Sequence, residues 1–145
     1  MATLKEIMTK DPVTVHPDDS AQKAASLMKD SHVGPIPVLD QESKLIGLIT
    51  DRDLAIKVVA EGRSADTKVS DVMSRNLFTC GPNDNVKEAI KMMEAHQVRR
   101  VPIVDDQGHL LGIVAQADIA TRTRKPARVA EAVESISKAS DSESR

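Results

Sequence analysis

The chain consists of one sequence pattern written twice. Residues 4–54 align with residues 69–119 at a constant offset of 65 without a gap, and 12 of the aligned pairs are identical. Chance would rarely preserve two prolines, a glycine and a closing aspartate together, so we interpret the pattern as a true duplication. The identical pairs are Met8/Met73, Thr14/Thr79, Pro17/Pro82, Asp19/Asp84, Ala24/Ala89, Met28/Met93, Val33/Val98, Pro37/Pro102, Asp40/Asp105, Leu45/Leu110, Gly47/Gly112 and Asp53/Asp118.

Each copy predicts the element order β-α-β-β-α after a short lead, which places the chain in the α/β (α+β) class. Apolar residues at helical spacing predict a helix after residue 20 and after residue 85, each preceded by turn and N-cap residues. Two apolar runs around an Asp-rich turn predict a hairpin at 36–49 and at 101–114. A unit of about fifty residues buries its faces poorly alone, so we expect the two copies to pack with pseudo-twofold symmetry.

The segment of residues 47–53 contains the candidate ligand-binding groups, because a predicted strand meets a predicted helix there. Thr50 is suited to be the N-cap, and Asp53 lies one turn further on. A hydroxyl, a helix start and a carboxylate within one turn can hold the phosphate and the cis-diol of a nucleotide. The second copy repeats the carboxylate as Asp118 but has Ala115 in place of the threonine.

Composition excludes several classes of function. A net charge of −2 over 145 residues gives no field that would attract nucleic acid or an acidic membrane. No apolar run approaches the length of a membrane span and no signal peptide is evident, so we expect a cytoplasmic protein. Cys80 is the one cysteine, and its apolar strand position favours a buried, inert thiol over a redox role.

The repeated order and the Gly-x-x-Thr-x-x-Asp ending resemble a cystathionine-β-synthase (CBS) domain, and the full chain resembles a stand-alone CBS pair, or Bateman module. His96–Pro102 is similar to a run in small bacterial CBS-pair proteins, including hypoxia-response types. On this resemblance residues 1–62 form the first repeat, 63–68 a linker, 69–124 the second repeat, and 125–145 a C-terminal helix with a disordered tail.

The resemblance implies a sensor of adenosine nucleotides with up to two clefts between the repeats. Asp53 and Asp118 would bind ribose hydroxyls, Thr50 would contact ribose or phosphate, and Arg100 would contact phosphate. The first-strand threonines, Thr14 and Thr79, would lie at the cleft edges. Since Ala115 lacks a hydroxyl and Gly34-Pro35 stands where the second copy has Arg99-Arg100, we expect the clefts to differ.

The candidate site residues also have purely structural explanations. Asp53 and Asp118 can simply cap helices, and Thr50 can be an N-cap alone. Arg99 and Arg100 can be solvated charges, although alternation along a strand leaves at most one facing a given cleft, and we favour Arg100. The basic run 121–128 lacks interleaved aromatics, which favours solvent or an acidic protein patch over nucleic acid. The four histidines lack the spacing of a metal site: His16, His32, His96 and His109.

Two functional hypotheses remain. The first is a regulatory module that binds AMP, ADP, ATP or another adenosyl compound and passes a shape change to a protein partner. The second is an interaction module with vestigial clefts that binds no nucleotide. An enzyme is not expected, because no catalytic constellation or phosphate loop appears. We also expect a homodimer through apolar helix residues such as Ile56 and Val59, and a docked helix carrying Val129, Val133 and Ile136.

Overall fold

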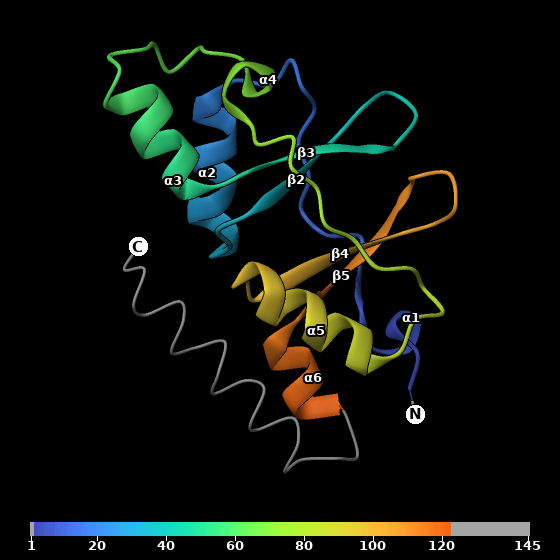
Figure 1. Cartoon of the computed structure of the whole chain (residues 1–145). Helices are drawn as coiled ribbons and strands as arrows, with labels where there is room; N and C mark the ends of the chain where they lie inside the picture. The colour runs from blue at the N-terminus through green and yellow to red at the C-terminus, as the bar shows by residue number, and fades with distance from the viewer. Residues whose placement is uncertain (1, 123–145) are drawn as a thin grey trace. The chain divides into compact units, whose positions relative to one another are not determined.

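The computed structural model describes residues 2–122 of the chain. These residues fall into two compact units (Figure 1), one made of Val13–Leu77 and the other of the residues up to Pro12 together with those from Phe78 onward. The mixture of helices and small antiparallel sheets confirms the predicted α+β class. The expected C-terminal helix at Val129–Ile136 lies outside the described residues.

The unit Val13–Leu77 is built around a two-stranded antiparallel sheet of β2 (Ile36–Leu39) and β3 (Leu45–Ile49), the hairpin that the sequence predicts. Helix α2 (Ala21–Ser31) precedes the hairpin. The short helix α3 (Asp51–Asp53) follows it and continues directly into the π-helix η1 (Leu54–Val59). Helix α4 (Val69–Val72) completes this unit.

The other unit holds a three-stranded antiparallel sheet in the order β1-β5-β4. Its strands are β1 (Thr9–Lys10), β4 (Arg100–Val104) and β5 (Leu110–Ala115). Its helices are α1 (Leu4–Ile7), α5 (Val86–His96) and α6 (Gln116–Arg122). The hairpin β4–β5 is the one predicted for the second copy.

Each copy begins with a short lead, residues 4–10 in the first copy and 69–75 in the second. In the structure, each lead packs with the other copy. The N-terminal lead, blue in Figure 1, adds β1 to the edge of β5, where Thr9 pairs with Ile113 and Lys10 with Gly112. The second lead, which contains α4, packs with the first copy, and Ser74 exchanges two backbone hydrogen bonds with Leu48 at 2.8 and 2.9 Å. Each compact unit therefore combines one copy's hairpin with the other copy's lead.

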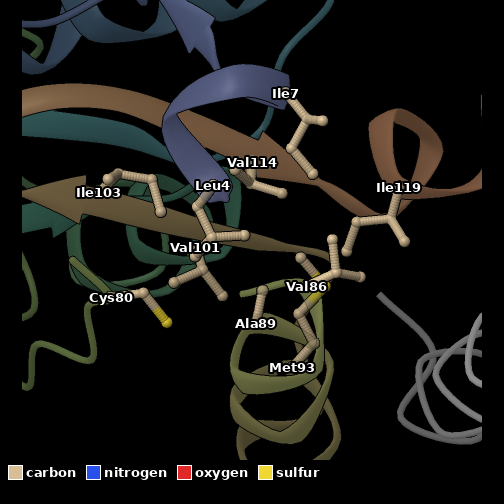
Figure 2. Close-up of a cluster of buried hydrophobic side chains, with 10 residues drawn as sticks. All are labelled: Leu4, Ile7, Cys80, Val86, Ala89, Met93, Val101, Ile103, Val114 and Ile119. Carbon is tan, nitrogen blue, oxygen red and sulfur yellow. The ribbon is translucent and has the colours of Figure 1, made fainter. Parts of the chain in front are cut away.

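Each unit has its own aliphatic core, as expected for a chain with a single phenylalanine. Figure 2 shows the core of the second-copy unit, where side chains of α1 meet those of α5, β4 and β5. The ten buried residues are Leu4, Ile7, Cys80, Val86, Ala89, Met93, Val101, Ile103, Val114 and Ile119. Met93 is fully buried, in agreement with the core role that its helical spacing predicts. The corresponding Met28 is only half-buried.

Both long helices begin as their sequences indicate, and both end on a left-handed residue. Ser20 accepts a hydrogen bond from the amide of Lys23 at 3.0 Å, and Asn85 accepts one from Glu88 at 3.1 Å. His32 and Gln97 end the helices in the left-handed conformation, with φ of 55° and 53°. Side-chain caps at the N-terminus and a left-handed residue at the C-terminus satisfy backbone groups that the helix leaves unpaired.

The structure corrects two details of the sequence-based prediction. The β-prone pieces around Thr14 and Thr79 do not form strands; Val15 and Cys80 each make only an isolated parallel bridge, to Val38 and Ile103. Proline lacks the N–H that would continue such a ladder, and Pro17 and Pro82 each follow the bridge by two residues. The closing helix of the first copy is a π-helix beyond Asp53, and of the neighbouring residues Val58 and Val59 only Val58 is buried.

Candidate functional site

The end of β3 positions the first group of predicted site residues. Thr50 is the N-cap of α3, and its Oγ1 accepts a hydrogen bond from the backbone N–H of Asp53 at 3.0 Å. Asp53 Oδ2 accepts the backbone N–H of Thr50 in return at 2.9 Å. This reciprocal capping box satisfies two helix-start donors and fixes the orientation of the carboxylate.

A lysine completes this site, and our sequence analysis did not identify it. Lys57 Nζ lies 3.1 Å from Asp53 Oδ1, so both oxygens of the carboxylate have a partner. The side chain of Asp53 is 13% exposed and that of Lys57 is 42% exposed, which places the cation on the more solvated side of the pair. The signal was present in the sequence, because acidic and basic residues four positions apart on a helix commonly pair.

The second copy repeats the carboxylate but not the hydroxyl. Asp118 Oδ2 accepts the backbone N–H of Ala115 at 3.1 Å, which matches the bond from Asp53 to Thr50. Ala115 has no side-chain oxygen to accept from the helix, so half of the capping box is missing. The strand-to-helix junctions of the two copies, at residues 50–53 and 115–118, therefore differ in their capping hydrogen bonds. Inequivalent binding by two clefts stays a prediction.

The strand opposite Ala115 supplies a cation. Arg100 pairs with Ala115 in the β4–β5 register, and directly opposed residues of an antiparallel ladder place their side chains on the same face. In the first copy the residue aligned with Arg100 is Pro35. The second junction thus has Ala115 paired with Arg100, where the aligned residues of the first copy are Thr50 and Pro35. Arg99 contributes its carbonyl, which accepts the backbone N–H of Gln116 at 2.9 Å.

The predicted site residues divide between the two compact units. Thr14, Thr50 and Asp53 belong to the unit Val13–Leu77, whereas Thr79, Arg100 and Asp118 belong to the unit that contains Phe78 and the residues after it. Both Thr14 and Thr79 are half-buried, one residue before the bridging residues Val15 and Cys80. The hydrogen bonds of the described region join the threonine and aspartate of the first junction but include neither Thr14 nor Thr79. Their contact with a ligand stays a prediction.

Histidine, cysteine and carboxylate side chains also occur elsewhere in residues 2–122. No group of three or more His, Cys, Asp or Glu side chains in this range is arranged to hold a metal ion. His109 Nδ1 lies 3.0 Å from Asp105 Oδ2 beside a hairpin turn, and His96 stacks on Phe78 with ring centroids 4.5 Å apart. Burial, helped by the nearby carboxylates of Asp84 and Glu88, raises the pKa of the Cys80 thiol to about 11, so little reactive thiolate forms at neutral pH.

The fold and the duplicated junctions define a protein built from two CBS domains in tandem. The CBS-domain family model matches residues 4–60 and again residues 69–124. The chain belongs to the CBS-domain family.

Two of the similar proteins are matched over most of their own length. A CBS domain-containing protein of Bacillus subtilis, YhcV, is 44% identical over 137 residues, which cover 94% of this chain and 96% of that protein. Hypoxic response protein 1 of Mycobacterium tuberculosis is 34% identical over 83% of this chain and 84% of its own length. A crystal structure of hypoxic response protein 1, described with two coordinated zinc ions, superimposes with a TM-score of 0.77 over 84% of this chain and 99% of its own.

A ligand is present in another similar structure. The CBS domain pair of protein MJ0100, in complex with 5′-methylthioadenosine and S-adenosyl-L-methionine, is 30% identical with a TM-score of 0.73 over 83% of this chain and 94% of its own. Some relatives are much longer: the chain spans 23% of the inosine-5′-monophosphate dehydrogenase of Methanocaldococcus jannaschii. None of the helices in the described region is long and apolar enough to cross a membrane.

Proposed function

We propose that this chain is a regulatory module that senses an adenosine nucleotide or a related adenosyl compound and signals to a protein partner in the cytoplasm. The observation that carries the proposal is the strand-to-helix junction that occurs in both copies. In each, an aspartate carboxylate is held against the backbone N–H at the strand end, at 2.9 Å for Asp53 and 3.1 Å for Asp118.

A carboxylate held in this way can recognise a ribose. It offers about four acceptor positions, of which the backbone amide uses one, so positions remain for the two hydroxyl donors of a cis-diol. Hydrogen bonds to a charged acceptor are stronger than those between neutral groups, and a fixed carboxylate loses little freedom when it makes them. A relative with bound 5′-methylthioadenosine and S-adenosyl-L-methionine supports this choice of ligand class.

The two junctions differ in what they offer to the rest of a ligand. Arg100 can donate two parallel hydrogen bonds to a phosphate, which favours a nucleotide at the second junction. Thr50 offers a hydroxyl at the first junction, although its oxygen already accepts from Asp53. We therefore propose that the second junction prefers phosphorylated adenosines and that the first accepts the adenosyl group with less dependence on phosphate.

The alternative is an interaction module that binds no nucleotide. Two observations favour it: both Asp53 oxygens already have partners within the protein, and the side chains of Ile56 and Val59 are 44% and 75% exposed on the closing helix. In that case the carboxylates serve as helix caps, and the exposed apolar residues bind a protein.

Thermal shift and calorimetric titration distinguish the two functions. The panel consists of AMP, ADP, ATP, NAD, S-adenosylmethionine, 5′-methylthioadenosine and cyclic dinucleotides. A ligand present at 100 times its Kd should stabilise the protein by about 2.7 kcal/mol. No shift with any member of the panel would reject the sensor and favour the interaction module.

The carboxylates are tested by Asp53→Asn and Asp118→Asn. Asparagine can still accept the backbone N–H, so the fold is retained while the charge is lost. If the site is occupied, the substitution should weaken binding about 10- to 150-fold, the equivalent of a charged hydrogen bond. Asp51→Asn is the matched control, because Asp51 is an exposed carboxylate on the same turn. Equal binding by all three variants would place the ligand elsewhere.

A further inference from the structure

Lys57 connects the proposed ligand-binding carboxylate to another part of the same unit. Its ammonium group lies 3.1 Å from Asp53 Oδ1 and donates a hydrogen bond to the backbone carbonyl of Val72, also at 3.1 Å. Val72 is the last residue of α4, and the chain continues from it through Leu77 into the other compact unit. One side chain therefore contacts both the Asp53 carboxylate and the segment that leaves this unit.

The segment after α4 is fixed to the strand that leads into the site. Ser74 exchanges backbone hydrogen bonds with Leu48, and Leu48 lies two residues before Thr50 on β3. The sulfur of Met73 packs so near Gly47 that an added Cβ there would lie 2.6 Å from it. These contacts form a closed network. It runs from Thr50 to Asp53, Lys57 and Val72, and returns through Ser74 to β3.

Within this network, the contact between Lys57 and Asp53 is the one that a ligand can most easily displace. The bond from Thr50 N–H to Asp53 Oδ2 is part of the backbone cap, whereas the Lys57 side chain is 42% exposed and reaches Oδ1 from the more solvated side. Ion pairs with this degree of exposure contribute little stability, so water can replace the carboxylate around the ammonium at small cost. Lys57 occupies one acceptor position of Oδ1 from the solvated side, so a cis-diol that approaches the carboxylate from solvent has to compete with the ammonium group for that position.

We propose that Lys57 competes with the ligand for Asp53 and transmits occupancy of the first junction to α4. This inference rests on the proposed adenosyl-binding function and adds to it the residue that couples the site to the rest of the chain. When ribose hydroxyls bind Asp53, Lys57 leaves Oδ1, its bond to the Val72 carbonyl loosens, and the segment Val72–Ser74 becomes more mobile. Linkage requires the reverse effect as well: removing the lysine should favour the ligand.

The test combines titration with amide hydrogen exchange on wild type, Lys57→Met and Lys44→Met. Lys44 is a matched control, because its side chain is 41% exposed and pairs with Glu42 at 3.5 Å, away from the junction. We expect Lys57→Met to bind 5′-methylthioadenosine about two- to fivefold more tightly than wild type, and Lys44→Met to be unchanged. 5′-Methylthioadenosine is the main probe because it carries no phosphate that could interact with the lysine directly.

Hydrogen exchange reports on the coupling itself. Met73 N–H donates to Val69 at 2.8 Å and Ser74 N–H to Leu48 at 2.8 Å, so both amides report on the attachment of the segment. In wild type, 5′-methylthioadenosine should speed their exchange about two- to fivefold. In Lys57→Met the exchange should already be fast without ligand and should not increase further.

Each contrary result has a distinct meaning. Weaker AMP binding by Lys57→Met with unchanged 5′-methylthioadenosine binding would overturn the competition and make Lys57 a phosphate contact. Equal Met73 and Ser74 exchange in the two lysine variants would overturn the coupling. If no probe binds wild type, the proposed function fails and ligand competition fails with it. The exchange comparison without ligand then still decides whether Lys57 holds the segment.

Discussion

Gly112 lies so close to the lead of the other copy that it has no room for a side chain. A Cβ on Gly112 would lie 2.6 Å from the backbone carbonyl oxygen of Thr9 and 2.8 Å from the sulfur of Met8. Gly47 is the aligned residue, and there a Cβ would lie 2.9 Å from the carbonyl oxygen of Ser74. In both units the glycine of the repeated motif allows the close approach of an exchanged lead.

Gly112→Ala should therefore destabilise the protein. A contact of 2.6 Å with a backbone oxygen requires the strand pair β1–β5 to separate, and overpacking of this kind costs about 1–3 kcal/mol. Urea denaturation measures the loss. Gly81→Ala is the control, since the nearest atom to its Cβ would be Asp84 Oδ2 at 3.6 Å, an ordinary contact. Equal stability of the two variants would contradict the packing explanation.

The capping boxes predict opposite effects of substitutions at the aligned positions Thr50 and Ala115. Thr50→Ala removes the acceptor of the Asp53 amide and should cost about 0.5–2 kcal/mol of unfolding free energy. Ala115→Thr supplies the hydroxyl that the second junction lacks, and we expect a gain of up to about 1 kcal/mol. Ala115→Val has the same shape without the hydroxyl, so a gain from valine as large as that from threonine would assign the effect to packing.

The turn between β4 and β5 should make stability depend on pH through Asp105. The backbone N–H of His109 donates to Oδ1 at 2.9 Å, and this bond, helped by the amide of Gln107 and the His109 side chain, lowers the pKa of Asp105 from 3.8. Because the folded pKa lies below the unfolded one, the stabilisation is present above the unfolded pKa and is lost as the pH falls through the folded pKa.

Asp105→Asn should consequently lower the unfolding free energy at neutral pH and have less effect in acid. Chemical denaturation at about pH 7 and about pH 3 measures the difference. Asp106→Asn serves as the control, because Asp106 is an exposed carboxylate in the same turn. A loss for Asp105→Asn that is as large in acid as at neutral pH would show that the charge of Asp105 has no stabilising role.

The exposed apolar residues of η1 predict a homodimer. Val59 is 75% exposed and Ile56 44% exposed in the isolated chain, and exposed apolar groups of this size commonly mark an interface. Light scattering should give twice the chain mass of 15.7 kDa at micromolar concentration. Val59→Glu should shift the protein toward monomer, whereas Gln41→Glu, on an exposed hairpin turn, should not. A monomeric wild type would contradict the prediction.

Periodicity and turn chemistry in the sequence were sufficient to predict the duplication, both hairpins, both long helices and their N-caps. These features depend on residues close together in the chain: Ser20 caps an amide three residues later, and Ile36–Leu39 pairs across a short turn. The capping role of Asp53 was likewise open to prediction, because its partner Thr50 is three residues away. The pairing with Lys57, four residues away, could have been predicted by the same reasoning.

The tertiary structure decided what depends on distant parts of the chain. Lys10 pairs with Gly112, and no local pattern in either strand identifies the other as its partner. The second contact of Lys57, with the carbonyl of Val72, likewise exists only because α4 packs in the same unit as η1. The sequence by itself thus determined the two hairpins, the two long helices and the two capping carboxylates, Asp53 and Asp118. Long-range backbone pairing and side-chain packing decided which lead completes each unit and what the lysine connects.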